Sequence, residues 1–142
     1  MTRSMMLSGI VLFVFLVVLT AGCIAHTLYD ETAFVEKDYE MEYGVEVVEA
    51  PLYLDVTLKT DGKPVDLLIL DESNYKVFSD GFTLGRYKPF RTIGFSPFII
   101  ETTETYTLPK KGMYYVVIEN SDYLNNGANA GRGVKYQITI GY

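Results

Sequence analysis

Apolar and polar side chains alternate along three segments of the chain, and this period of two predicts β-strands. The segments are residues 39–47, 52–58 and 134–140. Successive residues of a strand point to opposite faces of the sheet, so each segment would have one buried face and one solvated face. The pattern is clearest in the second segment, where the apolar positions are Leu52, Leu54, Val56 and Leu58.

Other segments complete a count of six or seven strands. Residues 65–70 and 113–119 are apolar on nearly both faces, as in a strand at the centre of a sheet. Residues 97–107 are expected to form another strand, and residues 71–78 one or two helical turns capped by Ser or Asp. No amphipathic helix of ten residues is expected after the N-terminal leader. The predicted fold is therefore all-β, an antiparallel β-sandwich of about seven strands preceded by an N-terminal signal or anchor helix.

The start of the chain reads as a targeting segment. Arg3 is the one charged side chain before Asp30, taking His26 as neutral, and residues 10–19 are entirely apolar. A charged start, an apolar run and a few small residues are typical of a secretory signal peptide. Residues 7–25 would also be long enough to span a membrane as an uncleaved helix.

The end of this leader, Leu19-Thr20-Ala21-Gly22-Cys23, resembles the lipobox of prokaryotic membrane lipoproteins. In that family the thiol of the motif cysteine receives a diacylglyceryl lipid, and the signal peptide is cut just before it. Thr20 stands where the family most often has Leu. The resemblance implies a lipid attachment at Cys23, with residues 1–22 as a signal peptide or membrane anchor. An uncleaved anchor helix and plain secretion are the alternatives.

Acidic residues are concentrated directly after the leader. The whole chain has 12 Lys plus Arg and 18 Asp plus Glu, a formal net charge of −6, and eight acids but one base lie between residues 30 and 49. We therefore expect a lipidated cysteine and acidic tether over residues 23–38 and the β-sandwich domain over residues 39–142. The acidic balance argues against a nucleic-acid partner. Because Arg3 favours the cytoplasmic side, the domain is expected outside the cell membrane, held by its lipid or helix.

Few residues suggest catalysis or a cofactor. The single His, His26, lies in the expected tether, and one Cys excludes a disulfide framework and a Cys/His zinc site. No glycine-rich phosphate loop occurs, so no cofactor is expected. A carboxylate pair for glycoside hydrolysis is an alternative, with Asp66, Asp71 and Glu101 as candidates. These three are better explained as strand-edge and turn residues, so we predict a protein that is not an enzyme.

Two loops hold oxygen-bearing side chains that suit calcium. They are residues 71–74 and residues 120–122. Neither has the spacing of an EF-hand loop, and Asp, Asn and Ser are common in turns for conformational reasons. No metal site is predicted.

Basic and aromatic residues are interleaved between residues 86 and 91, and this segment is the candidate partner surface. Its members are Arg86, Tyr87, Lys88, Phe90 and Arg91. A sugar, an anionic polymer or a neighbouring protein would suit such a surface outside the cell. The alternative is a surface loop whose aromatic residues cover the edge of the sandwich.

Two segments, PVDLLILDESNYKVF (residues 64–78) and LPKKGMYYVVIENSD (residues 108–122), resemble parts of the pre-peptidase C-terminal domains and of GOLD-type sandwiches. The likeness covers roughly residues 50–142. It implies an extracytoplasmic accessory or interaction module without catalysis. Separately, we expect the partner to be an envelope protein or a glycan. An extracytoplasmic sugar- or ion-binding accessory protein and a carboxylate-based envelope hydrolase are the alternatives.

Overall fold

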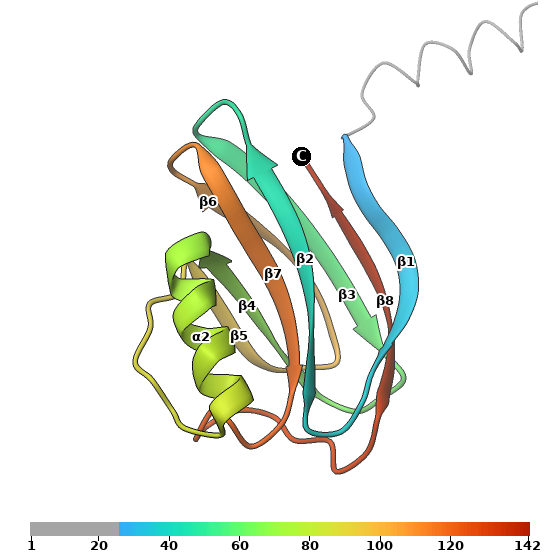
Figure 1. Cartoon of the computed structure of the whole chain (residues 1–142). Helices are drawn as coiled ribbons and strands as arrows, with labels where there is room; N and C mark the ends of the chain where they lie inside the picture. Colours follow the sequence, from blue (N-terminus) through green and yellow to red (C-terminus); the bar gives the residue numbers. More distant parts are fainter. Residues whose placement is uncertain (1–25) are drawn as a thin grey trace, which may run out of the picture.

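Two four-stranded sheets face each other in the computed structural model, which describes residues 26–142 (Figure 1). The first sheet has the order β1-β8-β3-β6 and the second has the order β2-β7-β4-β5. All neighbouring strands are antiparallel. The predicted all-β sandwich is confirmed, with eight strands rather than about seven in the described residues. The elements are β1 (Thr27–Val35), β2 (Tyr39–Val47), β3 (Leu52–Thr60), β4 (Val65–Asp71), α2 (Glu72–Leu84), β5 (Gly94–Ile99), β6 (Glu101–Leu108), β7 (Gly112–Asn120) and β8 (Val134–Gly141).

The central core lies between the two sheets and contains the alternating apolar residues that the sequence pattern indicated. Leu54, Val56 and Leu58 of β3 are fully buried in it, while the residues between them are exposed. Tyr43 and Tyr136 meet in the same core, with their hydroxyl oxygens 2.8 Å apart, so these polar atoms are paired. Removing this apolar surface from water is the main force that holds the sheets together.

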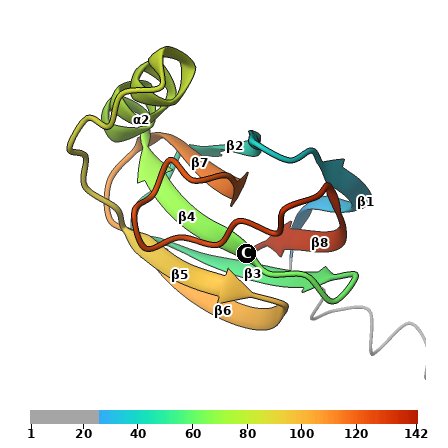
Figure 2. The same ribbon diagram turned by 90° about the horizontal axis from the view of Figure 1, so that it is seen from below.

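Strand β4 is buried on both of its faces, as predicted for a central strand. It lies between β7 and β5. Val65, Leu67 and Ile69 face the central core. Leu68 and Leu70 point the other way, to the outer face of the sheet, where α2 covers them. Figure 2 shows α2 on the outer side of this sheet, so the molecule has a second apolar layer outside the sandwich.

Helix α2 is longer than the one or two turns predicted within residues 71–78, since it runs for 13 residues. Asp71 caps its start by accepting the backbone N–H of Asn74 at 2.8 Å, as predicted. Gly85 ends it in the left-handed conformation, with φ of 61°, which glycine adopts without a steric penalty.

The apolar face of α2 is made of aromatic residues. Tyr75, Phe78 and Phe82 are three and four residues apart, the spacing that places side chains on one side of a helix. Phe78 is fully buried, and the ring of Tyr75 stacks on that of Tyr115 in β7 with centroids 4.0 Å apart. The expectation that no helix of ten residues follows the leader is therefore wrong.

The expected acidic tether over residues 23–38 is corrected in part, because Thr27–Val35 forms strand β1 and pairs with β8 along its length. The Tyr29 hydroxyl donates to the backbone carbonyl of Gly44 at 2.8 Å, and Val35 is fully buried in the central core. The charged side chains of β1 are exposed, so they do not oppose strand formation. The sandwich thus begins at Thr27 rather than at residue 39.

The predictions for the leader fall on residues that the structure does not describe. The signal peptide or membrane anchor over residues 1–22 and the lipid attachment at Cys23 both lie outside residues 26–142. Within residues 26–142, no helix has both the length and the apolar character that crossing a membrane requires. Both statements about the leader stay predictions.

Residues 97–107 belong to two strands rather than to one. Strand β5 pairs with β4 in the second sheet, whereas β6 pairs with β3 in the first sheet. The chain therefore passes from one sheet to the other at Ile100. Pro97 lies in β5, an edge strand, where the missing backbone N–H of proline is tolerated.

Candidate functional site

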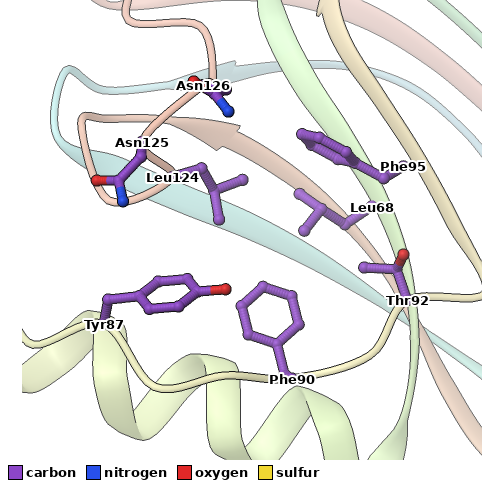
Figure 3. Close-up of a pocket in the computed structure, with 8 residues that line it drawn as sticks. All are labelled: Leu68, Tyr87, Phe90, Thr92, Phe95, Leu124, Asn125 and Asn126. Atoms are coloured by element: carbon purple, nitrogen blue, oxygen red, sulfur yellow. The ribbon is translucent and has the colours of Figure 1, made fainter.

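A pocket of about 330 Å³, here called the aromatic pocket, opens on the outer face of the second sheet (Figure 3). It lies between two loops, residues 85–93 after α2 and residues 121–133 after β7, with strands β4 and β5 at its base. The lining residues are Leu68, Tyr87, Phe90, Thr92, Phe95, Leu124, Asn125 and Asn126.

The base and one wall of the aromatic pocket are fixed by the sheet and by the aromatic residues of α2. Leu68 of β4 is fully buried, and Phe95 of β5 is its partner in the strand register. The Phe90 ring meets that of Phe78 edge to face, with centroids 5.4 Å apart. Tyr87 lies 6.2 Å from Phe90 by the same measure. Three aromatic rings therefore surround an opening whose base is an aliphatic side chain.

Loop 85–93 is held against α2 by backbone hydrogen bonds. The N–H of Arg86 donates to the carbonyl of Gly81 at 3.0 Å, and the N–H of Arg91 donates to the Asn74 side chain at 2.8 Å. These bonds fix the loop near both of its ends. A ligand would meet an ordered wall, which lowers the entropy lost on binding.

The opposite loop, residues 121–133, packs against α2 at a position that needs a glycine. A Cβ atom on Gly81 would lie 2.2 Å from the Tyr123 hydroxyl oxygen and 2.8 Å from the Arg86 carbonyl oxygen. The Tyr123 ring meets Phe78 edge to face at 5.4 Å. The small residue in α2 thus lets both loops approach the helix and each other.

Two buried carboxyl groups lie beneath loop 121–133. Asp66 of β4 and Glu119 of β7 are register partners, and neither has exposed surface. Asp66 accepts the backbone N–H of Ala128 at 2.8 Å and that of Phe98 at 3.0 Å. Glu119 accepts the hydroxyl of Ser121. The pair therefore joins the two central strands to the loop that carries part of the aromatic pocket.

Burial changes the protonation of this pair. Burial and the nearby Asp66 carboxylate together raise the pKa of Glu119 to about 8, although the hydrogen bond from Ser121 opposes the shift. Burial also raises the pKa of Asp66, but the backbone N–H groups of Phe98 and Ala128 oppose that shift. At neutral pH Glu119 therefore holds a proton while Asp66, with its N–H donors, is the better site for the negative charge.

The three carboxylates proposed from sequence as catalytic candidates are dispersed. Asp66 is fully buried beneath loop 121–133, on β4, which lies between β7 and β5, so its interpretation as a strand-edge residue is wrong. Neither it nor Glu119 lines the aromatic pocket. Asp71 caps α2. Glu101 is exposed at the start of β6, 3.7 Å from the Lys59 ammonium. Among residues 26–142, no three His, Cys, Asp or Glu side chains form a group that could hold a metal ion.

The structure brings together two of the five residues predicted as a partner surface. Tyr87 and Phe90 line the aromatic pocket, but Arg86, Lys88 and Arg91 do not. The sequence reasoning missed the members that come from other elements. They are Leu68, Thr92, Phe95, Leu124, Asn125 and Asn126.

A second hollow of about 440 Å³ adjoins the aromatic pocket. Tyr87 and Asn125 line both, so they form the boundary between them. The second hollow also contains the carboxylates of Asp38 and Asp122, and both residues are exposed. The two hollows together form a groove with an aromatic half and a more polar half.

Comparisons with known proteins identify no family for this chain. No protein-family model matches it, and no curated protein matches it either. Two solved structures are similar in fold. One is the pre-peptidase C-terminal domain of a collagenase from Bacillus anthracis, with 11% identity, a TM-score of 0.48 and coverage of 78% of this chain and 88% of that one. The other is PliG of Aeromonas hydrophila, a periplasmic inhibitor of g-type lysozyme, with 12% identity, a TM-score of 0.48 and coverage of 82% and 86%.

Proposed function

We propose that this protein is a non-enzymatic binding module, anchored on the extracytoplasmic face of the cell membrane, that binds a component of the cell envelope through the aromatic pocket. The observation that carries this proposal is the pocket itself. It combines aromatic side chains with amide groups on two loops that hydrogen bonds and packing hold in place. Concave, largely apolar sites with a few polar groups are typical of ligand binding.

The lining of the aromatic pocket supports binding rather than catalysis. None of its eight residues is Asp, Glu, His, Lys, Arg or Cys, and the phenol of Tyr87 is its one ionisable group. General acid-base chemistry needs a proton carrier within hydrogen-bond reach of the reacting group. The nearest buried acids, Asp66 and Glu119, have no exposed surface through which a substrate could reach them.

The position of the aromatic pocket suits a domain that is attached by its N-terminus. Thr27, at the start of β1, pairs with Gly141, whereas Val35, at its other end, pairs with Val134, which directly follows loop 121–133 (Figure 1). The two ends of β1 are roughly 26 Å apart, because each residue of a strand advances about 3.3 Å. An anchor before Thr27 would leave the pocket loops at the far end, facing away from the membrane. Anchoring also raises the local concentration of the module, so weak contacts become sufficient.

Removing two aromatic side chains should weaken binding to the envelope at least about fivefold. Tyr87 and Phe95 are 54% and 42% exposed, so a Tyr87→Ala/Phe95→Ala variant should keep its fold while losing two contacts of about 0.5–1.5 kcal/mol each. The measurement is retention of the detergent-solubilised full chain on an immobilised envelope fraction of the host. Tyr53→Ala is the matched control, since Tyr53 is 60% exposed on β3. Equal retention of all three proteins would reject the aromatic pocket as the binding site.

Replacing Cys23 with Ala should abolish lipid attachment. The chain has one thiol, so no other residue can form the thioether. We expect incorporation of a labelled fatty acid to disappear and the protein to move from the membrane to the soluble extracytoplasmic fraction. If the variant kept both the fatty-acid label and its membrane association, lipid anchoring at Cys23 would be contradicted. Absence of label in both proteins together with continued membrane association would identify an uncleaved helix instead.

A further inference from the structure

We infer that the aromatic pocket binds one ring of a neutral oligosaccharide, an inference that rests on the proposed binding role of this pocket. Four features of the described residues support it: the absence of charge in the lining, the arrangement of rings, the free amide groups, and the adjoining second hollow. Each restricts the class of ligand in a different way.

The aromatic pocket lacks ionic groups. Its eight lining residues are all uncharged at neutral pH, and the basic side chains of loop 85–93 are not among them. An ionic ligand would lose hydration on entering the pocket and gain no opposite charge in return, which is costly. The ligand group that enters is therefore expected to be neutral.

The rings provide apolar contact over a wide surface. Tyr87, Phe90 and Phe95 surround the opening, and Leu68 lies at its base (Figure 3). A pyranose ring has faces composed of C–H groups that carry a small positive charge, and an aromatic face carries a small negative one. A sugar ring stacked on these side chains would match their flat surface and would place its positive C–H groups on their negative ring faces.

The amide groups separate a sugar from a purely apolar ligand. Asn125 and Asn126 are exposed at the pocket, and in the part of the chain that the structure describes no protein group hydrogen-bonds to their side chains. Figure 3 shows Thr92 near the opposite wall, beside Phe90 and Phe95. Each amide offers donors and an acceptor, which matches neighbouring hydroxyl groups of a sugar. An apolar group in the same place would desolvate these polar atoms without replacing their hydrogen bonds.

The second hollow indicates a chain of sugars rather than a single one. A volume of about 330 Å³ is at the lower end of the range for small-ligand sites, and the adjoining hollow adds about 440 Å³. Tyr87 and Asn125 face both spaces, so a ligand can continue from one to the other. The exposed carboxylates of Asp38 and Asp122 would accept hydrogen bonds from hydroxyl groups of the next residue.

Titration of the full chain with neutral tetrasaccharides tests the inference. The probes are chitotetraose, cellotetraose and maltotetraose, and the chain is held in a zwitterionic detergent without a sugar head group. We expect saturable binding of at least one probe, measured by calorimetry, with a Kd of about 1 mM or lower. Tyr87→Ala and Asn125→Ala should each weaken it at least fivefold, while Tyr53→Ala should leave it unchanged.

The outcomes separate this inference from the proposed function. Binding of no probe at about 10 mM, ten times a Kd of about 1 mM, would overturn the sugar assignment. If Tyr87→Ala/Phe95→Ala still reduced retention on the envelope fraction, the binding role of the pocket would stand with another ligand. Sugar binding that both single variants leave intact would also overturn the inference, because the sugar would then bind elsewhere. Circular dichroism of each variant establishes that it is folded.

Discussion

Replacing Glu119 with Gln should stabilise the protein by about 4 kcal/mol at pH 8 and by almost nothing at pH 4. Glu119 has no exposed surface, and burial raises its pKa from 4.5 to about 8 in the folded protein. A proton must therefore be taken up when the chain folds at neutral pH. Gln has a similar shape and needs no proton, so it removes this requirement.

The sign of the pH dependence follows from the direction of the shift. A group whose folded pKa is raised favours the folded state fully below its unfolded pKa, here about 4.5, and this contribution is lost as pH rises toward 8. The slope is about 1.4 kcal/mol per pH unit for one group. Burial raises the pKa of Glu40 to about 7, which adds in the same direction. Asp71 and Glu104 have lowered pKa values, and their stabilising contribution is lost only in more acidic solution.

Urea denaturation of the wild type and of Glu119→Gln at pH 4, 6 and 8 measures this effect. Glu101→Gln is the matched control, because Glu101 is an exposed acid whose partner Lys59 is also exposed. The gap in unfolding free energy between wild type and Glu119→Gln should widen with pH, whereas the gap for the control should stay near zero. A gap for Glu119→Gln that is the same at all three values would show that Glu119 is not protonated in the folded protein.

The buried acid pair also connects protonation to the aromatic pocket. Asp66 holds the backbone of Ala128, and a Cβ atom on Gly127 would lie 2.1 Å from Asp66 Oδ2, so loop 121–133 closes tightly over the pair. Asn125 and Asn126 belong to the same loop. If both carboxyl groups were ionised, the two buried negative charges would repel each other and weaken the packing of loop 121–133 against the sheet. The acid pair thus helps to hold the loop that carries Asn125 and Asn126.

Much of the sandwich was predictable because alternation within a strand is a local signal. Strand β3 and strand β8 have the alternating burial that their sequences indicated. Strand β1 was missed because Asp30 and Glu31 hide its period, although both acids are exposed and accept hydroxyl hydrogen bonds, from Thr139 and Tyr43 respectively. A count of charges does not report which side of a strand carries them.

The helix and the pocket depend on packing between distant segments, so the sequence indicated them only in part. Tyr87 and Phe90 were predicted from their local cluster, but Asn125 and Asn126 lie more than thirty residues away and reach the pocket through the pairing of β4 with β7. Local composition marked their loop only as rich in Asn and Gly. The sequence of β4 did contain a signal for the helix and the loops: the outer face of this strand is apolar, so another segment had to pack on it.

Phe78→Ala should destabilise the protein by about 3–5 kcal/mol, the usual cost of deleting a buried aromatic side chain. Phe78 has no exposed surface, and its ring lies 5.7 Å from Phe82 and 5.4 Å from both Phe90 and Tyr123, measured between centroids. It is the residue of α2 that touches both walls of the aromatic pocket. Its removal would leave a cavity under the helix that neither the sheet nor the loops can fill.

Chemical denaturation at pH 5, where Glu119 is protonated, measures this loss of unfolding free energy. Leu84→Ala is the matched control on the same helix, because Leu84 is 63% exposed and its truncation should cost less than about 0.5 kcal/mol. Phe78→Leu keeps most of the buried volume and should fall between the two, which preserves a folded variant for binding. Since Phe90 packs on Phe78, that variant should also bind the envelope fraction more weakly than Leu84→Ala does. If Phe78→Ala lowered the free energy of unfolding by less than about 1 kcal/mol, the Phe78 ring would not be what packs α2 against the sheet. Other contacts would then have to hold the wall of the aromatic pocket.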